Sequence, residues 1–133
     1  MNKDKKGIIL VVEDNLSNLK LVKDILMFHG YEVIEARDGK TALDKIQEYH
    51  DKLDLILMDI QLPEMDGFEV VKIIKSDNLT KNLSVFAISA YALEKDIKKA
   101  LKVGCDEYIT KPINLENFIE KINSFFKLKG TKF

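Results

Sequence analysis

Short apolar runs alternate along the chain with longer segments in which apolar residues recur at helical spacing. The clearest runs cover residues 8–12, 55–58 and 85–88, and weaker ones cover residues 32–36 and 108–110. Strands of a parallel sheet are covered on both faces, so they are apolar almost throughout rather than at alternate positions. The runs therefore predict five strands inside the molecule.

The segments between these runs carry apolar residues at intervals of three and four. The pattern is clearest near the end of the chain and also appears after the first run, at Leu115, Phe118, Ile119, Ile122, Phe125 and Phe126 and at Leu16, Leu19, Val22, Ile25 and Leu26. This spacing predicts helices that bury one face. Gly30 and Gly104 each follow such a segment, where a left-handed residue often ends a helix. We expect both glycines to end helices.

The order of the predicted elements is strand and then helix, repeated five times. Strict alternation predicts a parallel sheet with helices on both faces and right-handed crossovers. Five units in 133 residues fit an α/β fold of the flavodoxin-like (βα)5 type, doubly wound, with strand order 2-1-3-4-5. We expect a single domain over residues 1–133, with a core of about residues 7–127 and short polar tails.

Composition narrows the class of protein. The chain is 46% hydrophobic and 32% charged, which is typical of a soluble globular domain. Its 21 basic and 22 acidic residues give no overall attraction to nucleic acid or to an anionic membrane. Cys105 is the only cysteine, which excludes an internal disulfide and favours a reducing compartment. With no apolar stretch of membrane-spanning length, the sequence predicts a cytoplasmic protein.

Carboxylates gather where two of the predicted strands end. Glu13 and Asp14 follow the first strand, and Asp59 follows the third. These two strands are neighbours in the predicted order, and ligands of open parallel sheets bind beyond the carboxyl ends of such strands. Three carboxylates in one pocket repel one another. Either some are protonated, with raised pKa values, or a hard divalent cation binds among them.

Mg²⁺ suits a site that offers few oxygen ligands and leaves room for water. We expect Asp14 and Asp59 to be direct ligands, the backbone carbonyl of Gln61 to be a third, and Glu13 to act through water. Mn²⁺ is the natural substitute for Mg²⁺ at such a site.

Two further polar residues fall at the same edge of the predicted sheet. Ser89 ends the fourth strand and Lys111 follows the fifth. A metal ion, an ammonium group and a hydroxyl together can spread the charge of a transferring phosphoryl group. Asp59 would then be the nucleophile and would form an aspartyl phosphate.

Four segments resemble a known family, the receiver domains of two-component response regulators. They are residues 9–15 (ILVVEDN), 55–67 (LILMDIQLPEMDG), 87–90 (AISA) and 108–112 (YITKP). The resemblance extends over about residues 8–126. Residues 58–64 (MDIQLPE) are especially similar to stand-alone receivers of the DivK type and to receiver modules of hybrid histidine kinases.

The resemblance implies a role for each residue at the strand ends. Asp59 would be the phosphorylation site, Glu13 and Asp14 the acidic metal pair, Ser89 the switch hydroxyl and Lys111 the conserved lysine of the family. Serine replaces the more common threonine at position 89 and keeps the hydroxyl.

Two more features are implied by the resemblance alone. Tyr108 falls at the position of the switch aromatic, although packing against the sheet would also explain a tyrosine there. The peptide bond between Lys111 and Pro112 is typically cis in receivers.

We expect a response regulator that signals by protein contact. A histidine kinase or histidine phosphotransfer protein would phosphorylate Asp59 with Mg²⁺, and the face formed by the fourth helix, fifth strand and fifth helix would bind a downstream protein. Apart from its own phosphorylation and slow autodephosphorylation, it would not be an enzyme. No segment is left for a nucleic-acid-reading module or a membrane anchor.

Three alternatives remain. The chain begins at Met1 and ends shortly after the last helix, which favours a stand-alone protein over a receiver module excised from a hybrid histidine kinase. A Mg²⁺-dependent phosphohydrolase commonly has a second carboxylate two residues after its nucleophile, and here that position is Gln61. A binding module that works without phosphorylation would not need the complete set of polar residues.

Overall fold

Five parallel strands form one sheet in the order β2-β1-β3-β4-β5, which confirms the predicted fold class. The computed structural model describes residues 6–91 and 93–130, so the two predicted polar tails lie largely outside the described residues. The strands are β1 (Ile8–Val12), β2 (Glu32–Ala36), β3 (Leu55–Asp59), β4 (Ser84–Ser89) and β5 (Glu107–Thr110). The helices are α1 (Leu16–Phe28), α2 (Gly39–Tyr49), α3 (Gly67–Ser76), α4 (Glu94–Val103) and α5 (Leu115–Gly130).

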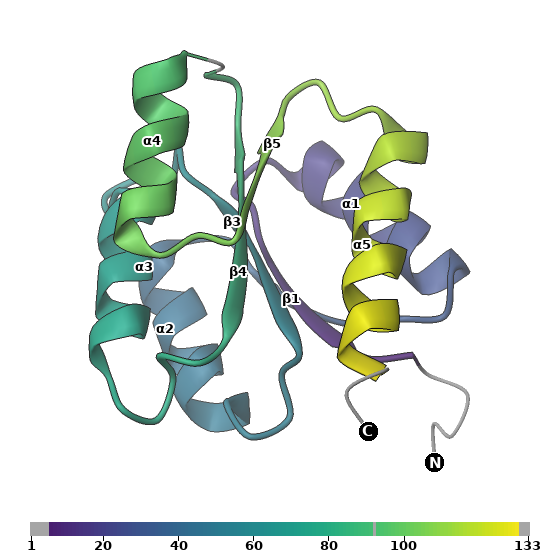
Figure 1. The fold of residues 1–133 in the computed structure, drawn as a ribbon, viewed down its shortest axis with the longest axis horizontal. Coiled ribbons are helices and arrows are strands. Elements are labelled where there is room, and N and C mark those ends of the chain that lie inside the picture. Colours follow the sequence, from purple (N-terminus) through teal and green to yellow (C-terminus); the bar gives the residue numbers. More distant parts are fainter. Residues whose placement is uncertain (1–5, 92, 131–133) are drawn as a thin grey trace.

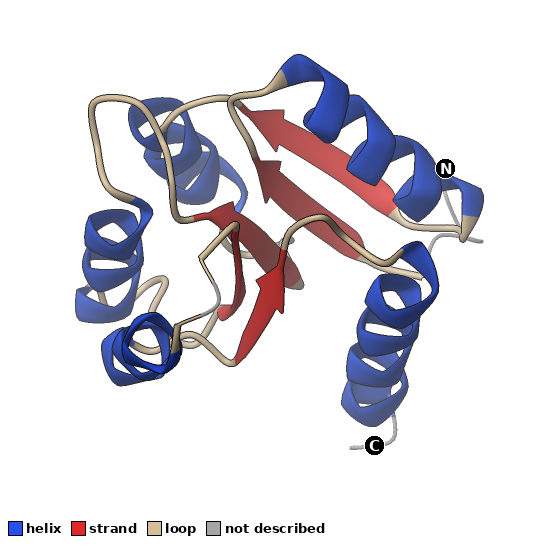
Figure 2. Ribbon diagram, turned by 90° about the horizontal axis from the view of Figure 1, so that it is seen from above, coloured by secondary structure: helices blue, strands red, loops and turns tan. Residues whose placement is uncertain are grey.

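The sheet is the middle of three layers. Helices α1 and α5 cover one face, and α2, α3 and α4 cover the other (Figure 1). Figure 2 shows the same arrangement from above, with the strands between the two groups of helices. In β1, Leu10 and Val12 contact the side of α2 to α4, whereas Ile9 and Val11 contact the side of α1 and α5. Burial on both faces explains why the strands are apolar without alternation.

Helices α1 and α5 bury the predicted apolar face, but not at their first residue. In α1, Leu19, Val22 and Leu26 are buried, whereas Leu16, at the first position, is 60% exposed. In α5, Phe118 and Ile122 are buried, and the first residue, Leu115, is 37% exposed. The prediction that Leu16 and Leu115 belong to the buried face is therefore wrong. Both residues begin a helix directly after a loop at the strand ends, where the sheet offers little to pack against.

The two predicted helix-ending glycines have the expected backbone. Gly30 follows α1 with φ of 94°, and Gly104 is the C-cap of α4 with φ of 113°. Both values lie in the left-handed region that glycine adopts without steric cost. These turns return the chain to the sheet, so that all five strands end at the same edge.

Candidate functional site

The predicted carboxylates meet at the carboxyl edge of the sheet. Asp59 is the last residue of β3 and Glu13 directly follows β1, and these strands are hydrogen-bonded neighbours. Asp59 is 2% exposed and Glu13 is 4% exposed, whereas Asp14 is only partly buried. One carboxylate oxygen of each residue lies within 4.8 Å of the others. Among the described residues, this cluster has the oxygen donors that a hard cation needs.

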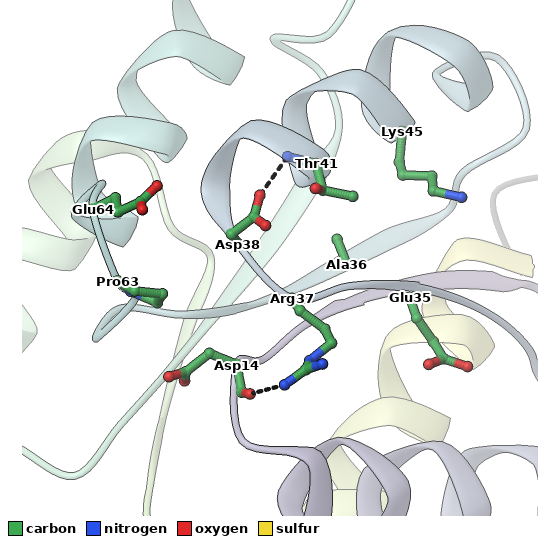
Figure 3. Close-up of a pocket in the computed structure, with 9 residues that line it drawn as sticks. All are labelled: Asp14, Glu35, Ala36, Arg37, Asp38, Thr41, Lys45, Pro63 and Glu64. Carbon is green, nitrogen blue, oxygen red and sulfur yellow. Dashed lines mark hydrogen bonds between the residues drawn. The ribbon is translucent and has the colours of Figure 1, made fainter.

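Backbone contacts decide which of the two acidic residues after β1 points inward. The Glu13 N–H continues the sheet by donating to the Ala36 carbonyl at 3.0 Å, and the Glu13 carboxylate accepts from the Asn15 N–H at 3.2 Å. The backbone carbonyl of Asp14 accepts from the Arg37 guanidinium at 3.2 Å, while its carboxylate points away from Arg37 (Figure 3). Glu13 is therefore fixed inside the site, and Asp14 lies at its mouth.

Lys111 joins the two buried carboxylates. Its ammonium group lies 2.9 Å from Glu13 Oε1 and donates to Asp59 Oδ2 at 3.0 Å. The other Asp59 oxygen, Oδ1, accepts from the Gln61 N–H at 2.8 Å. Lys111 thus pairs with two of the three clustered carboxylates, so the cluster has an excess of negative charge when all of them are ionised.

Burial and neighbouring charges both change the pKa values of the site. Burial raises the pKa of Glu13 to about 6; Lys111 opposes this by hydrogen bonding, and the neighbouring Asp59 adds to it. Burial disfavours the charged form of Lys111, but its hydrogen bonds to Glu13 and Asp59 outweigh this and raise its pKa. A divalent cation would neutralise the remaining charge, so these donors fit Mg²⁺ by their chemistry.

Ser89 is the last residue of β4 and has no exposed surface. Its hydroxyl oxygen accepts from the Tyr91 N–H at 3.0 Å, which ties it to the loop that leads to α4. The hydroxyl of Tyr108, in β5, donates to the Tyr91 carbonyl at 2.6 Å. The side-chain oxygen of Gln61 accepts from the Ala90 N–H at 3.0 Å in the same loop. Three side chains of the site region therefore hold one short loop.

The loop after Asp59 passes very close to the start of α3. A Cβ atom at Gly67 would lie 2.6 Å from both the Asp59 carbonyl oxygen and the Ile60 Cα, and these are backbone atoms that cannot move aside. The Asp66 carboxylate caps α3 by accepting from the Phe68 N–H at 2.9 Å. Turn and capping chemistry thus accounts for this part of the loop.

The remaining features that bear on the site are one peptide bond, the two histidines and the cysteine. The peptide bond between Lys111 and Pro112 is cis, as the resemblance implies. His29 and His50 are the C-cap residues of α1 and α2, away from the carboxylates. Cys105 is buried, and burial raises the pKa of its thiol to about 12, with Asp106 adding to the effect and Lys75 opposing it.

An open depression of about 740 Å³ adjoins the carboxylates (Figure 3). Most of its charged residues lie in or just after β1, β2 and β3, and one lies on α2: Asp14, Glu35, Arg37, Asp38, Glu64 and Lys45. Sequence reasoning missed Arg37, the hydrogen bond of the Gln61 side chain and the part played by Tyr91. Ile60-Gln61 and Ala90-Tyr91 directly follow strands, but nothing in the sequence pairs the two loops.

Comparison with known proteins gives one consistent result. The family model described as response regulator receiver domain matches residues 9–123. The polar-differentiation response regulator DivK of Brucella ovis is 45% identical over 117 residues, which are 88% of this chain and 94% of that protein. DivK of Brucella anthropi is 44% identical with the same coverage.

Solved structures agree with the sequence relatives. A CheY-like response regulator receiver domain protein of Methanospirillum hungatei has a TM-score of 0.84 and 31% identity, with 96% of this chain and 98% of that chain covered. The chemotaxis protein CheY4 of Vibrio cholerae has a TM-score of 0.83 and 28% identity, with 90% and 98% covered. Over the part of the chain that the structure describes, no helix has the length and apolar character to cross a membrane.

Proposed function

Since the chain belongs to the response regulator receiver domain family, we propose that it is a phosphorylation switch whose acceptor is Asp59. The observation that carries the proposal is the surroundings of this carboxylate. Asp59 is almost fully buried at the end of β3, one of its oxygens accepts from Lys111, and two further carboxylates lie within 4.8 Å. A purely structural aspartate at a strand end would not need this combination of groups.

The family uses Mg²⁺, and we propose where this chain holds it. Asp14 and Asp59 are the direct ligands, the backbone carbonyl of Gln61 is the third, and Glu13 acts through water. The clustered oxygens and the raised pKa of Glu13 support this assignment. When bound, the cation supplies positive charge for the oxygens of the transferring phosphoryl group.

In the proposed reaction, a carboxylate oxygen of Asp59 attacks the phosphorus of a phosphohistidine. The new bond is O–P, the N–P bond breaks, and the imidazole nitrogen keeps the electron pair of that bond. Lys111 can turn from the Asp59 oxygen to a phosphoryl oxygen, and the Ser89 hydroxyl can donate to another. Ser89 ends β4, the strand next to β3, and Lys111 follows β5 and already contacts Asp59, so little movement is needed.

The same contacts connect phosphorylation to a surface. If Ser89 turns toward the phosphoryl group, the Tyr91 N–H loses its partner, and Tyr91 also accepts from Tyr108. We propose that Tyr108 then rotates inward. This rotation shifts the equilibrium between two conformations of the face formed by α4, β5 and α5. A downstream protein would bind one of the two states.

Membership of the family implies a histidine kinase or a histidine phosphotransfer protein as the donor. Such a donor would place the reaction in the cytoplasm. The chain catalyses only its own phosphorylation and slow autodephosphorylation, and it acts on no separate substrate in this proposal.

The test is incubation with phosphoramidate and Mg²⁺, followed by measurement of the intact mass. Wild type is expected to gain one phosphoryl group, and Asp59→Asn none. Asp66→Asn is the matched control, because Asp66 lies in the following loop and asparagine also caps helices well. This control should be modified like wild type. Equal modification of wild type and Asp59→Asn would contradict the proposal.

A further inference from the structure

A groove lies between α3 and α4, which run side by side on one face of the sheet (Figure 1). It has a volume of about 500 Å³ and is lined by Lys72, Lys75, Ser76, Lys99, Lys102 and Val103. Four of the six lining residues are lysines, two from each helix, and no lining residue is acidic. We call this feature the basic groove.

The four lysines of the basic groove make no ion pairs, and in this they resemble seven of the other lysines in the described part of the chain. Within residues 6–91 and 93–130, none of the four has a carboxylate at ion-pair distance, whereas six lysines elsewhere do: Lys20, Lys23, Lys98, Lys111, Lys121 and Lys129. Lys75 donates instead to the carbonyls of Lys81, at 3.3 Å, and Leu83, at 2.5 Å. Lys99 lies over the Phe68 ring, 4.7 Å from its centroid. For Lys75 and Lys99, neutral groups thus take the place of carboxylates.

This arrangement leaves like charges close together. Lys72 and Lys75 are three residues apart on α3, as are Lys99 and Lys102 on α4, so the pairs share a helix face. The stem of Lys75 also packs over Gly104, at the end of α4, which keeps this lysine at the junction of the helices. Repulsion of this kind opposes packing of the two helices, and a bound anion would relieve it.

We propose that the basic groove binds a short oligophosphate, such as a linear triphosphate, free or as part of a nucleotide. Val103 is the only apolar lining residue, so charge rather than burial must hold the ligand. Lysine ammonium groups bind phosphate oxygens well as compact point charges. The volume is in the range of small-molecule sites, about 300–1,000 Å³.

The length of the ligand is limited by acidic residues at one end of the basic groove. Lys99 also lines a neighbouring depression, together with Asp66 and Asp96, on the side of the carboxylate site. A long polyanion, such as nucleic acid, would extend over these carboxylates and be repelled. The net charge of −1 gives no compensating attraction. A short oligophosphate avoids this repulsion, and its binding does not depend on phosphorylation of Asp59.

The test is calorimetric titration of the full chain with tripolyphosphate at low ionic strength, without Mg²⁺. Lys99→Gln/Lys102→Gln removes two charges from the basic groove, and Lys40→Gln/Lys52→Gln removes two exposed charges in and just after α2 as the matched control. Loss of two charge-assisted contacts should weaken binding at least about tenfold, whereas the control should change it less than about twofold. Lys99→Arg/Lys102→Arg should restore most of the affinity. A nucleoside triphosphate that binds like tripolyphosphate would show that the phosphate chain alone is recognised, and tighter binding would assign the site to nucleotides.

Three results would overturn the proposal. The first is an absence of saturable binding to wild type, and the second is equal weakening in the groove and control variants. The third is tighter binding of a glutamate-rich peptide than of tripolyphosphate, lost in Lys99→Gln/Lys102→Gln, which would make the basic groove a site for an acidic protein segment. Amide NMR spectra of each variant check that the fold is intact.

Discussion

The carboxylate site and the basic groove are two concentrations of charge that the fold produces in different ways. In the carboxylate site, strand ends bring Glu13 and Asp59 together in a buried place, and Lys111 bridges them. In the basic groove, two helix faces bring lysines together in an exposed place, where no carboxylate of the described residues pairs with them. Burial makes each partner in the first region costly to remove, and water makes each lysine in the second cheap to remove.

The largest effect should follow removal of the bridging lysine. Lys111→Gln leaves two buried carboxylates without their ammonium partner and removes a donor to the phosphoryl group. We expect phosphorylation by phosphoramidate to fall by at least about a hundredfold, the order of one catalytic donor. Without Mg²⁺, the free energy of unfolding should fall by about 2 kcal/mol. This is less than the cost of breaking a fully buried ion pair, because the site opens to solvent.

The matched control is Lys99→Gln, in the basic groove, measured in the same phosphorylation assay and by urea denaturation. Its free energy of unfolding should change by less than about 0.5 kcal/mol, as for ordinary surface substitutions. Similar losses in Lys111→Gln and Lys99→Gln would remove the distinction between the two regions.

A difference in stability of about 1–2 kcal/mol should separate alanine substitutions at the two glycines that border these regions. In Gly67→Ala, the new Cβ would lie 2.6 Å from backbone atoms, so the loop after Asp59 must move, at a cost of about 2–3 kcal/mol. In Gly104→Ala, the nearest contact is the flexible stem of Lys75, and the left-handed backbone costs about 1 kcal/mol. Urea denaturation measures both values, and a larger loss in Gly104→Ala would contradict this reading of the contacts.

The pH dependence of stability offers a third comparison. The folded pKa of Glu13 is about 6, above its ordinary value of 4.5. Between these two pH values, the carboxyl group of Glu13 therefore keeps its proton in the folded state and has released it in the unfolded state. In metal-free protein, this stabilising effect is present below pH 4.5 and is lost as the pH rises through 6. The loss is about 2 kcal/mol at most.

Glu13→Gln is the control for that pH profile, since its side chain cannot titrate. Chemical denaturation between pH 4 and 7 in a chelator should give a smaller decrease for this variant than for wild type. Mg²⁺ should offset the decrease in wild type near pH 7, because a ligand of the folded state stabilises it. An identical profile in both proteins would rule out Glu13 as the titrating group.

The smallest effect is expected at Tyr108. Tyr108→Phe removes one exposed hydrogen bond to the Tyr91 carbonyl and keeps the ring, so the free energy of unfolding should fall by no more than about 1 kcal/mol. Phosphorylation of Asp59 should persist at a similar rate. A loss of phosphorylation comparable to that of Lys111→Gln would place Tyr108 in the chemistry rather than in the response to it.

The fold and the carboxylate site could be predicted because both follow from local patterns. Continuous apolar runs identify strands that are covered on two faces, and residues just beyond them must share one edge of the sheet. Asp59 and Ser89 proved to be the last residues of their strands. The burial of Leu16 was wrongly predicted because periodicity does not show where the sheet ends beneath a helix.

Contacts between loops and between helices could not be predicted. The hydrogen bond between Gln61 and the Ala90 N–H joins residues 29 positions apart, and no pattern in either segment indicates it. The two lysines on α3 are likewise far in sequence from the two on α4. On each helix alone, the two lysines look like part of an ordinary solvated face. Only tertiary packing turns two such faces into the basic groove.

The most direct test of the central claim is to locate the phosphoryl group. After reaction with phosphoramidate and Mg²⁺, borohydride reduces an aspartyl phosphate to homoserine, which tandem mass spectrometry of peptides can assign to one residue. The account predicts homoserine at position 59 and unchanged aspartate at Asp14 and Asp66. Homoserine at another aspartate, with Asp59 intact, would contradict it.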